Sequence, residues 1–317
     1  MVVSVKIKNY FHAYRFFRLT KNVMKQRRET MNLYSTLESY DVIIKERSTI
    51  FKLDKHMEAP NWTMDGKYII YNSDGLIWQY DLANGEHSQI DTGDIIACNN
   101  DHVLSTNGKE IAISSMEPGT DLNISGYNSY IYILPLSGGT PRKITPLSPS
   151  FLHGWSPDGN TLAYCAMRQG ENGDIYTISV EGGEESRLTN TEGLSDGPEY
   201  SADGKHIWFN SVKSGLMQIW RMDIDGSNQQ RITTDNRNNW FPHVSPDSKS
   251  VAYISYRKGD VNPGDHPANK NVQLNIMNYD GSENSVLVNL FGGQGTFNVN
   301  SWSPDSSKFA FVSYELK

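Results

Sequence analysis

Cysteine is scarce in this chain of 317 residues, so a disulfide framework does not hold it together. Cys98 and Cys165 are far apart and form no metal-binding or redox spacing, which favours buried free thiols over a disulfide. No apolar run approaches the ~18 residues that cross a membrane. The N-terminus also lacks the unbroken apolar core of a signal peptide. As written, the sequence predicts a cytoplasmic protein with no transmembrane segment; a periplasmic location stays open if the start site is misassigned.

The chain also has no excess of basic residues. The net charge is −7, with 29 Lys and Arg against 36 Asp and Glu, and eight of the basic residues fall within residues 1–28. Without those eight and Glu29, the rest of the chain has 21 basic against 35 acidic residues, a net charge near −14. Nucleic-acid binding depends mainly on neutralising phosphates. We therefore expect no DNA or RNA partner.

The basic segment at residues 1–30 allows two interpretations. Its aromatic residues between positions 11 and 17 could form the apolar face of a basic helix, which would favour an anionic surface. We prefer the simpler interpretation, in which the segment is a disordered arm or an extension upstream of a true start at Met24 or Met31.

What the chain has in abundance is repetition. "WSPDGNTLAYCA" at 155–166 recurs as "YSADGKHIWFNS" at 200–211 and "WSPDSSKFAFVS" at 302–313. One turn residue per copy gives intervals of 42, 51, 45, 44 and 58 residues between the six anchors Asp65, Asn107, Asp158, Asp203, Asp247 and Asp305. A base period near 43 residues is the size of a four-stranded propeller blade.

Each copy predicts the same hairpin. An aromatic residue usually precedes a Ser-Pro-Asp-Gly turn or a variant of it, in which Pro presets φ and Gly or Ser allows the reversal. A strand with Ala between large residues follows, as in "LAY" at 162–164, so that neighbouring sheets approach closely. The second half of a copy, such as "IYTISVEGGEESRLT", adds a strand, a Gly-containing hairpin turn and an edge strand.

The ring closes at six copies. The last copy supplies only two strands, and two further strands, predicted at Asp41–Ile44 and Ser48–Leu53, precede the first copy. Together they complete the last blade and remove exposed sheet edges. The sequence thus predicts an all-β fold: a single six-bladed β-propeller over residues 31–317, with four-stranded antiparallel blades closed by the N-terminal strands.

These copies resemble the WD40-like repeats of the TolB-type β-propeller family over roughly residues 41–317. The resemblance is carried by "WSPDG" at 155–159, "SPDSK" at 245–249 and "WSPDS" at 302–306. It implies a stand-alone propeller, without the N-terminal α/β domain of TolB. Related propellers serve as periplasmic scaffolds, as gates on prolyl oligopeptidases and as bodies of polysaccharide lyases.

Strand alternation assigns the loops to two faces. Because consecutive strands of a blade run in opposite directions, both short turn types lie on one face and all longer connections on the other. The two longest insertions, Met116–Ser129 and Arg257–Asn271, belong to the second and fifth blades, which are opposite each other in a ring of six. We expect them to flank a cleft over the central channel, on what we call the long-loop face.

Polar and aromatic residues on the connections are the candidate ligand-binding residues. They are His153, Asp196, Glu199, Trp240, His243, Gln294 and Asn298 from the connectors, with His266 from the fifth-blade insertion. His153, Asp196 and His243 precede the inner strands of three adjacent blades and are predicted to face one space at the channel mouth. The weak point of this prediction is strand parity, because a shift of one residue turns a side chain away from the channel.

A divalent metal ion in the central channel is the one cofactor that these residues suggest. His153 and His243 are its candidate ligands. The resemblance to oligogalacturonate-lyase-type propellers, which place a His-rich metal site there, implies the same. In the alternative interpretation, the candidate residues only hydrogen-bond connector backbones and rim waters.

One sharper motif is discounted. Residues 193–197, "GLSDG", match the Gly-x-Ser-x-Gly nucleophile elbow, which requires a strand before it and a helix after it. No helix is predicted there, so Ser195 is interpreted as an accidental match. No phosphate-binding loop, dinucleotide fingerprint or zinc-protease motif is present.

The sequence therefore favours a monomeric, non-catalytic propeller that binds a protein partner or a saccharide on its long-loop face. The alternative is a metal-assisted lyase or hydrolase acting on an acidic oligosaccharide, with Arg257, Lys258 and Lys270 as cations near the substrate.

Overall fold

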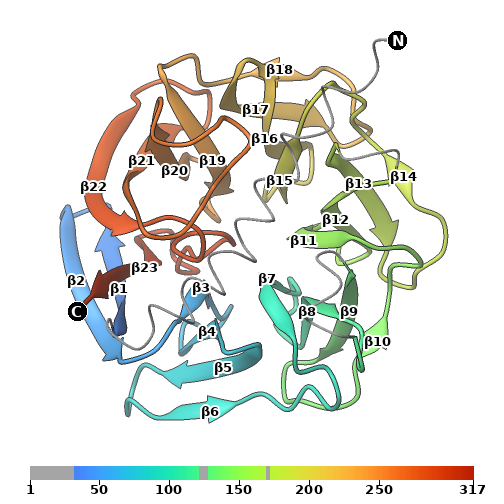
Figure 1. Cartoon of the computed structure of the whole chain (residues 1–317), viewed down its shortest axis with the longest axis vertical. Coiled ribbons are helices and arrows are strands. Elements are labelled where there is room, and N and C mark those ends of the chain that lie inside the picture. Colours follow the sequence, from blue (N-terminus) through green and yellow to red (C-terminus); the bar gives the residue numbers. More distant parts are fainter. Residues whose placement is uncertain (1–31, 121–127, 169–171) are drawn as a thin grey trace, which may run out of the picture.

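The strands form six antiparallel sheets arranged in a ring (Figure 1). The computed structural model describes residues 32–120, 128–168 and 172–317. Within these ranges no helix is long and apolar enough to cross a membrane. The arm predicted at residues 1–30 lies outside the described residues, as do residues 121–127 of the second-blade insertion.

Five of the sheets contain four strands in chain order. Blade 1 consists of β3 (Glu58–Trp62), β4 (Tyr68–Ser73), β5 (Leu76–Asp81) and β6 (His87–Gln89). Blade 2 consists of β7 (Cys98–Leu104), β8 (Glu110–Met116), β9 (Ser129–Pro135) and β10 (Arg142–Lys143). Blade 3 consists of β11 (Ser150–Trp155), β12 (Thr161–Ala166), β13 (Asp174–Ser179) and β14 (Ser186–Arg187).

Blade 4 consists of β15 (Ser195–Tyr200), β16 (His206–Ser214), β17 (Leu216–Asp223) and β18 (Gln230–Arg231). Blade 5 consists of β19 (Arg237–Val244), β20 (Ser250–Arg257), β21 (Lys270–Asn278) and β22 (Ser285–Gly292). Figure 1 shows the first strand of each blade near the centre of the ring and the fourth at the rim. The two short turn types therefore share one face, and the connectors and the fifth-blade insertion share the other, as predicted.

The sixth blade joins the two ends of the described chain. Strand β1 (Leu33–Asp41) lies between β2 (Glu46–Leu53) and β23 (Lys308–Leu316), and it pairs with β23 from Leu33↔Leu316 to Asp41↔Lys308. The inner strand of this blade is reduced to a single bridge between Trp302 and Phe309. Closure by the N-terminal strands is confirmed.

The predicted position of the first closing strand was wrong. Residues 42–45 form the turn between β1 and β2, with Ile43 and Ile44 exposed, rather than the end of a strand at Asp41–Ile44. The Asp41 carboxylate accepts the amides of Ile43 and Ile44 at 2.9 and 3.0 Å, and Lys45 has a φ of 57°. These local contacts turn the chain where apolar residues suggested a strand.

One hydrogen-bond pattern explains the recurring turn. In blade 3, Ser156 Oγ donates to Asp158 Oδ1 at 2.5 Å, and the same carboxylate oxygen accepts the amide of Asn160 at 3.0 Å. Ser156 Oγ in turn accepts the amide of Thr161 at 2.9 Å. The same three bonds recur in all six copies, beginning at Thr63, Ser105, Ser156, Ser201, Ser245 and Ser303. The repeated residues are therefore a structural device of the short-turn face.

The core lies between neighbouring blades. In four blades, the second strand carries a fully buried Ala seven residues after the Ser that begins the recurring turn. These are Ala112, Ala163, Ala252 and Ala310. Blades 1 and 4 have Ile70 and Trp208 there, also fully buried. Inner strands of adjacent blades contact one another in the order β3, β7, β11, β15 and β19. Large and small residues thus alternate so that the sheets interdigitate.

Candidate functional site at the channel mouth

Every inner strand from β3 to β19 has a bulge near its long-loop end. The register shifts fall between Glu58/Asn61, Cys98/His102, Leu152/Gly154, Asp196/Glu199 and Trp240/His243. Within these bulges, Ala59, Gly197 and Phe241 hold the same repeat position and adopt φ values of 52°, 60° and 52°. A bulge re-aims the side chains that precede it, and a left-handed residue other than Gly is strained. The backbone is therefore distorted at the same level around the ring, where the candidate residues lie.

A buried charged cluster spans three blades at this level. His153 Nε2 of β11 lies 3.2 Å from Asp196 Oδ1 of β15 and 4.0 Å from Asp101 Oδ1 of β7. All three residues are less than 8% exposed. Two of the three residues predicted to share the channel mouth, His153 and Asp196, are thus in contact.

The surroundings perturb the pKa of each member of this cluster. Burial alone would lower the pKa of His153, but the carboxylates of Asp101 and Asp196 outweigh it and raise the pKa to about 9. Burial alone would raise the pKa of Asp196, but His153 lowers it to about 2. Burial raises the pKa of Asp101 to about 7, against the opposing charge of His153. The pair of His153 and Asp196 is therefore held in its charged form.

Asp101 was missed by the sequence analysis. It lies in "NNDHVLSTNG", the weakest of the six copies, which lacks both the aromatic residue and the Pro of the turn. Asp101 Oδ2 accepts a hydrogen bond from Asn99 Nδ2 at 2.9 Å, and the Asp101 amide donates to Asn99 Oδ1 at 3.0 Å. An aspartate next to a repeat motif was the only signal that could have identified it.

Aromatic rings cover one side of the cluster. His266, from the insertion between β20 and β21, stacks on Trp240 with ring centroids 4.2 Å apart and planes 20° apart. Phe241 stacks on His153 at 5.5 Å. Burial lowers the pKa of His266 to about 4 despite the nearby Asp196, so the ring is neutral near pH 7. Trp240 is fully buried under His266 and is not an open aromatic platform.

Glu199 and His243 belong to a second cluster. Glu199 Oε2 lies 2.6 Å from His243 Nδ1, and Phe297 O lies 3.2 Å from His243 Nε2. Both ring nitrogens of His243 therefore face acceptor atoms of the protein. Glu199 Oε1 also accepts from the Val244 amide and from Asn300 Nδ2, both at 2.7 Å. These bonds connect blades 4, 5 and 6.

The two histidines proposed as metal ligands are therefore in different surroundings. No hydrogen bond or ion pair joins His243 to His153 in the described part of the chain. Each ring nitrogen of His243 already faces a protein group, and His153 pairs with Asp196, so the residues do not fit a metal site shared by these two imidazoles. Across residues 32–120, 128–168 and 172–317, no group of three His, Cys, Asp or Glu side chains is arranged as a metal site.

Gln294 and Asn298 lie in the connector that follows blade 5. Gln294 O accepts a hydrogen bond from the Tyr314 hydroxyl at 3.4 Å, and Asn298 Oδ1 accepts the Gly295 amide at 2.7 Å. Nine buried polar atoms on or next to the inner strands have no hydrogen-bond partner among the described residues: Asn61 Oδ1, Asn100 Nδ2, His102 Nδ1 and Nε2, His153 Nδ1, Asn238 Nδ2, Asn239 Oδ1, Trp240 Nε1 and Asn298 Nδ2. Buried polar atoms normally find partners, so this level of the ring is suited to polar contacts.

Ser195 is the first residue of strand β15 and is fully buried. Its hydroxyl donates to Ser211 Oγ at 3.0 Å on the neighbouring strand. No helix follows it, which confirms that the nucleophile-elbow match is accidental.

The chain is similar to known propellers over most of its length. The family model described as the TolB β-propeller domain matches residues 125–268. A protein from Agrobacterium fabrum is 42% identical over 284 residues, which are 89% of this chain and 93% of that protein. The solved structure of a protein assigned as TolB from Agrobacterium tumefaciens superposes with a TM-score of 0.82 at 43% identity, and the match covers 90% of this chain and 99% of that one.

TolB from Acinetobacter baumannii shares the fold, with a TM-score of 0.65 at 22% identity. That match covers 83% of this chain and 65% of that one. With a relative 42% identical across nearly all of both chains, and with the six-bladed ring of four-stranded repeats, the chain belongs to the TolB-type β-propeller family.

Proposed function

We propose that this propeller is a non-catalytic binding module that recognises a protein partner or a saccharide on its long-loop face, over the channel mouth. The observation that carries the proposal is the His153–Asp196 pair, which is buried and charged beneath the mouth, close to polar atoms that lack partners. A ligand that reaches this level can satisfy those atoms, and desolvated polar contacts confer specificity.

The contrast between the two faces supports this assignment. The short-turn face repeats the same residues and hydrogen bonds six times, so its chemistry is fixed by the needs of the fold. The residues of the long-loop face differ from blade to blade, as ligand recognition requires. Two side chains that could serve catalysis are already engaged in the fold, since Ser195 is buried in a strand and both ring nitrogens of His243 face other protein groups.

The test compares the two faces. Ligands recovered from a glycan array or from a bacterial lysate are measured one at a time against the wild type, Asp196→Asn and the opposite-face control Lys205→Gln, whose side chain is exposed. We expect Asp196→Asn to weaken binding at least tenfold and the control to leave it unchanged. Ligands whose affinity responds to Lys205→Gln but not to Asp196→Asn would refute the proposal.

A further inference from the structure

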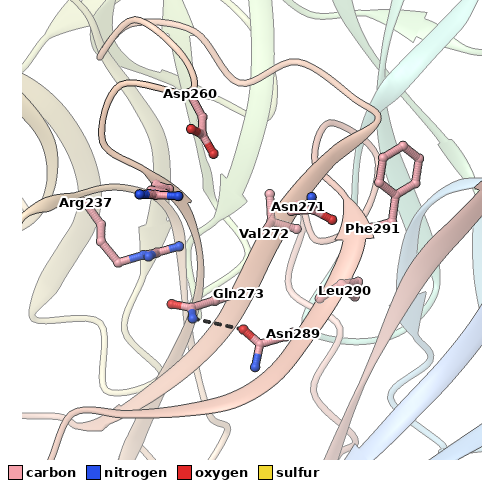
Figure 2. Close-up of a pocket in the computed structure, with 9 residues that line it drawn as sticks. Arg237, Asp260, Asn271, Val272, Gln273, Asn289, Leu290 and Phe291 are labelled. Atoms are coloured by element: carbon pink, nitrogen blue, oxygen red, sulfur yellow. Dashed lines mark hydrogen bonds between the residues drawn. The ribbon is translucent and has the colours of Figure 1, made fainter.

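Blade 5 carries a cavity on the long-loop face. It has a volume of about 550 Å³ and lies where all four strands of the blade reach that face (Figure 2). Its lining includes Arg237, Arg257, Asp260, Gln273 and Asn289, with Phe291 on the opposite side from Arg237. None of these residues belongs to the charged cluster at the channel mouth, so the cavity is independent of that site.

Two arginines face each other across this blade. Arg237 of β19 and Arg257 of β20 are direct cross-strand partners. Like charges at directly opposed positions destabilise an antiparallel pair. Within the described residues neither guanidinium forms an ion pair, and Arg257 forms no side-chain hydrogen bond. The Arg237 guanidinium donates to Ser255 Oγ at 3.0 Å and to Ser255 O at 3.5 Å.

The position of these polar residues on the sheet is itself unusual. Side chains two residues apart share a sheet face, so Val251, Tyr253, Ser255 and Arg257 point the same way. Val251 and Tyr253 pack with Trp208 of blade 4 in an apolar cluster. Closer to the long-loop face, the residues on this side of the sheet are polar: Ser255, Gln273 and Asn289, which are neighbours across three strands.

The residues that line the cavity carry one positive charge in excess. Burial lowers the pKa of Arg237 and the neighbouring Arg257 adds to this, while Asp235 and Asp260 oppose it without reaching ion-pair distance. Two guanidinium groups and the single carboxylate of Asp260 line the cavity. A ligand with one negative charge would neutralise the excess charge of the lining, whereas a polyanion would be repelled by the Asp260 carboxylate.

The other lining groups define the rest of the ligand. Gln273 Nε2 donates to Asn289 Oδ1 at 2.9 Å, drawn as the dashed line in Figure 2. Within the described residues this leaves Gln273 Oε1 and Asn289 Nδ2 as a free acceptor and a free donor. Such a pair suits hydroxyl groups, which both donate and accept. A planar guanidinium fork suits a carboxylate.

We propose that the blade-5 cavity is a binding site for a small hydroxylated monocarboxylate, with Arg237 and Arg257 on the carboxylate and the Gln273–Asn289 pair on its hydroxyls. The volume is in the range of small-molecule sites. The site adds a ligand class to the long-loop face without depending on the channel mouth.

The test uses the full chain and three matched probes: glucuronate, which has a carboxylate and hydroxyls; glucose, which lacks the carboxylate; and inorganic phosphate. Titration calorimetry should show glucuronate binding at least tenfold tighter than either of the others. Arg257→Gln should weaken glucuronate binding at least tenfold, and the exposed control Arg231→Gln should leave it unchanged. Arg257→Gln should also raise the melting temperature of the unliganded protein, because it removes a like-charge pair; this shows that the variant is folded.

Several results would overturn the proposal: no glucuronate binding at millimolar concentration, equal binding of glucose or phosphate, or unchanged affinity in Arg257→Gln. Asp196→Asn separates the two sites. If it abolishes glucuronate binding while Arg257→Gln does not, the ligand occupies the channel mouth, and the blade-5 site is wrong although the proposed function stands.

Discussion

Glu199 offers the sharpest test of whether a candidate ligand residue has a structural role instead. Its carboxylate accepts three hydrogen bonds, from His243 Nδ1, the Val244 amide and Asn300 Nδ2, at 2.6 to 2.7 Å. The three donors come from blade 5 and from the connector into blade 6. Glu199→Ala would leave all three donors without this acceptor in a site where Glu199 is only 6% exposed.

The expected magnitude follows from the number of bonds lost. Each buried donor left unsatisfied costs about 1–3 kcal/mol, and breaking a buried pair by removing one partner costs about 3–5 kcal/mol in total. We therefore expect Glu199→Ala to lower the free energy of unfolding by about 4 kcal/mol. With an unfolding entropy of about 2.1 cal/mol/K per residue, a propeller of this size loses about 7 °C in melting temperature. Glu199→Gln keeps one oxygen acceptor and should lose less than half of that.

Differential scanning calorimetry and urea unfolding measure both variants against Glu181→Ala, whose side chain is 81% exposed and should change little. Ligand binding at the two proposed sites should survive Glu199→Gln. If both Glu199 variants melt within 1 °C of the wild type, or if Glu199→Gln loses ligand binding while staying folded, the structural assignment of Glu199 is refuted.

Three further predictions follow from the fold and from the charged cluster. The pKa of His153 is raised in the folded state to about 9, so the stabilisation from its protonated form is complete below about pH 6.5 and is lost as pH rises through 9; urea unfolding at pH 6 and 9.5 should show this loss in the wild type and not in His153→Gln. Deleting residues 33–53 removes β1 and β2 and should lower the stability of the whole ring, seen as one early transition in calorimetry, whereas loss of a separate small transition would contradict closure by these strands. A fluorophosphonate probe should not label the native protein at Ser195, which is fully buried, and stoichiometric labelling there would contradict its place in β15.

The fold could be predicted because six copies of one sequence pattern each indicate the same blade. The position of one closing strand could not be predicted. Strand β1 reads "LYSTLESYD", with a glutamate near its middle. Glu38 is nevertheless buried, because Arg47 of β2 donates to it at 2.5 and 2.7 Å and Ser313 of β23 donates at 2.5 Å. The partners that allow Glu38 to be buried in a strand are not its sequence neighbours. Local hydrophobicity therefore indicated a strand at the apolar residues 42–44, which form a turn.

The candidate site was predictable only in part, for a reason that lies in the backbone. His153 and Asp196 were predicted to face one shared space, and in the structure they are in direct contact. His243 was predicted to join them, but it lies beyond the bulge of β19, at the same repeat position as Glu199 in β15, and it pairs with Glu199 instead. Sequence periodicity assumes a regular strand, and a bulge breaks that assumption at the level where function would be encoded.

The recurring turn and the candidate binding residues lie at opposite ends of each inner strand. The turn at its far end is fixed by three hydrogen bonds that need Ser or Thr and Asp or Asn, and all six copies meet that requirement. Five residues before that first hydroxyl, the chain carries Glu58, Asn100, Phe151, Asp196, Trp240 and Asn298. No two neighbouring blades agree there, although all five inner strands from β3 to β19 have a bulge close by. Because the recurring turn does not involve these positions, their residues can differ from one blade to the next, and the two proposed sites can share the long-loop face.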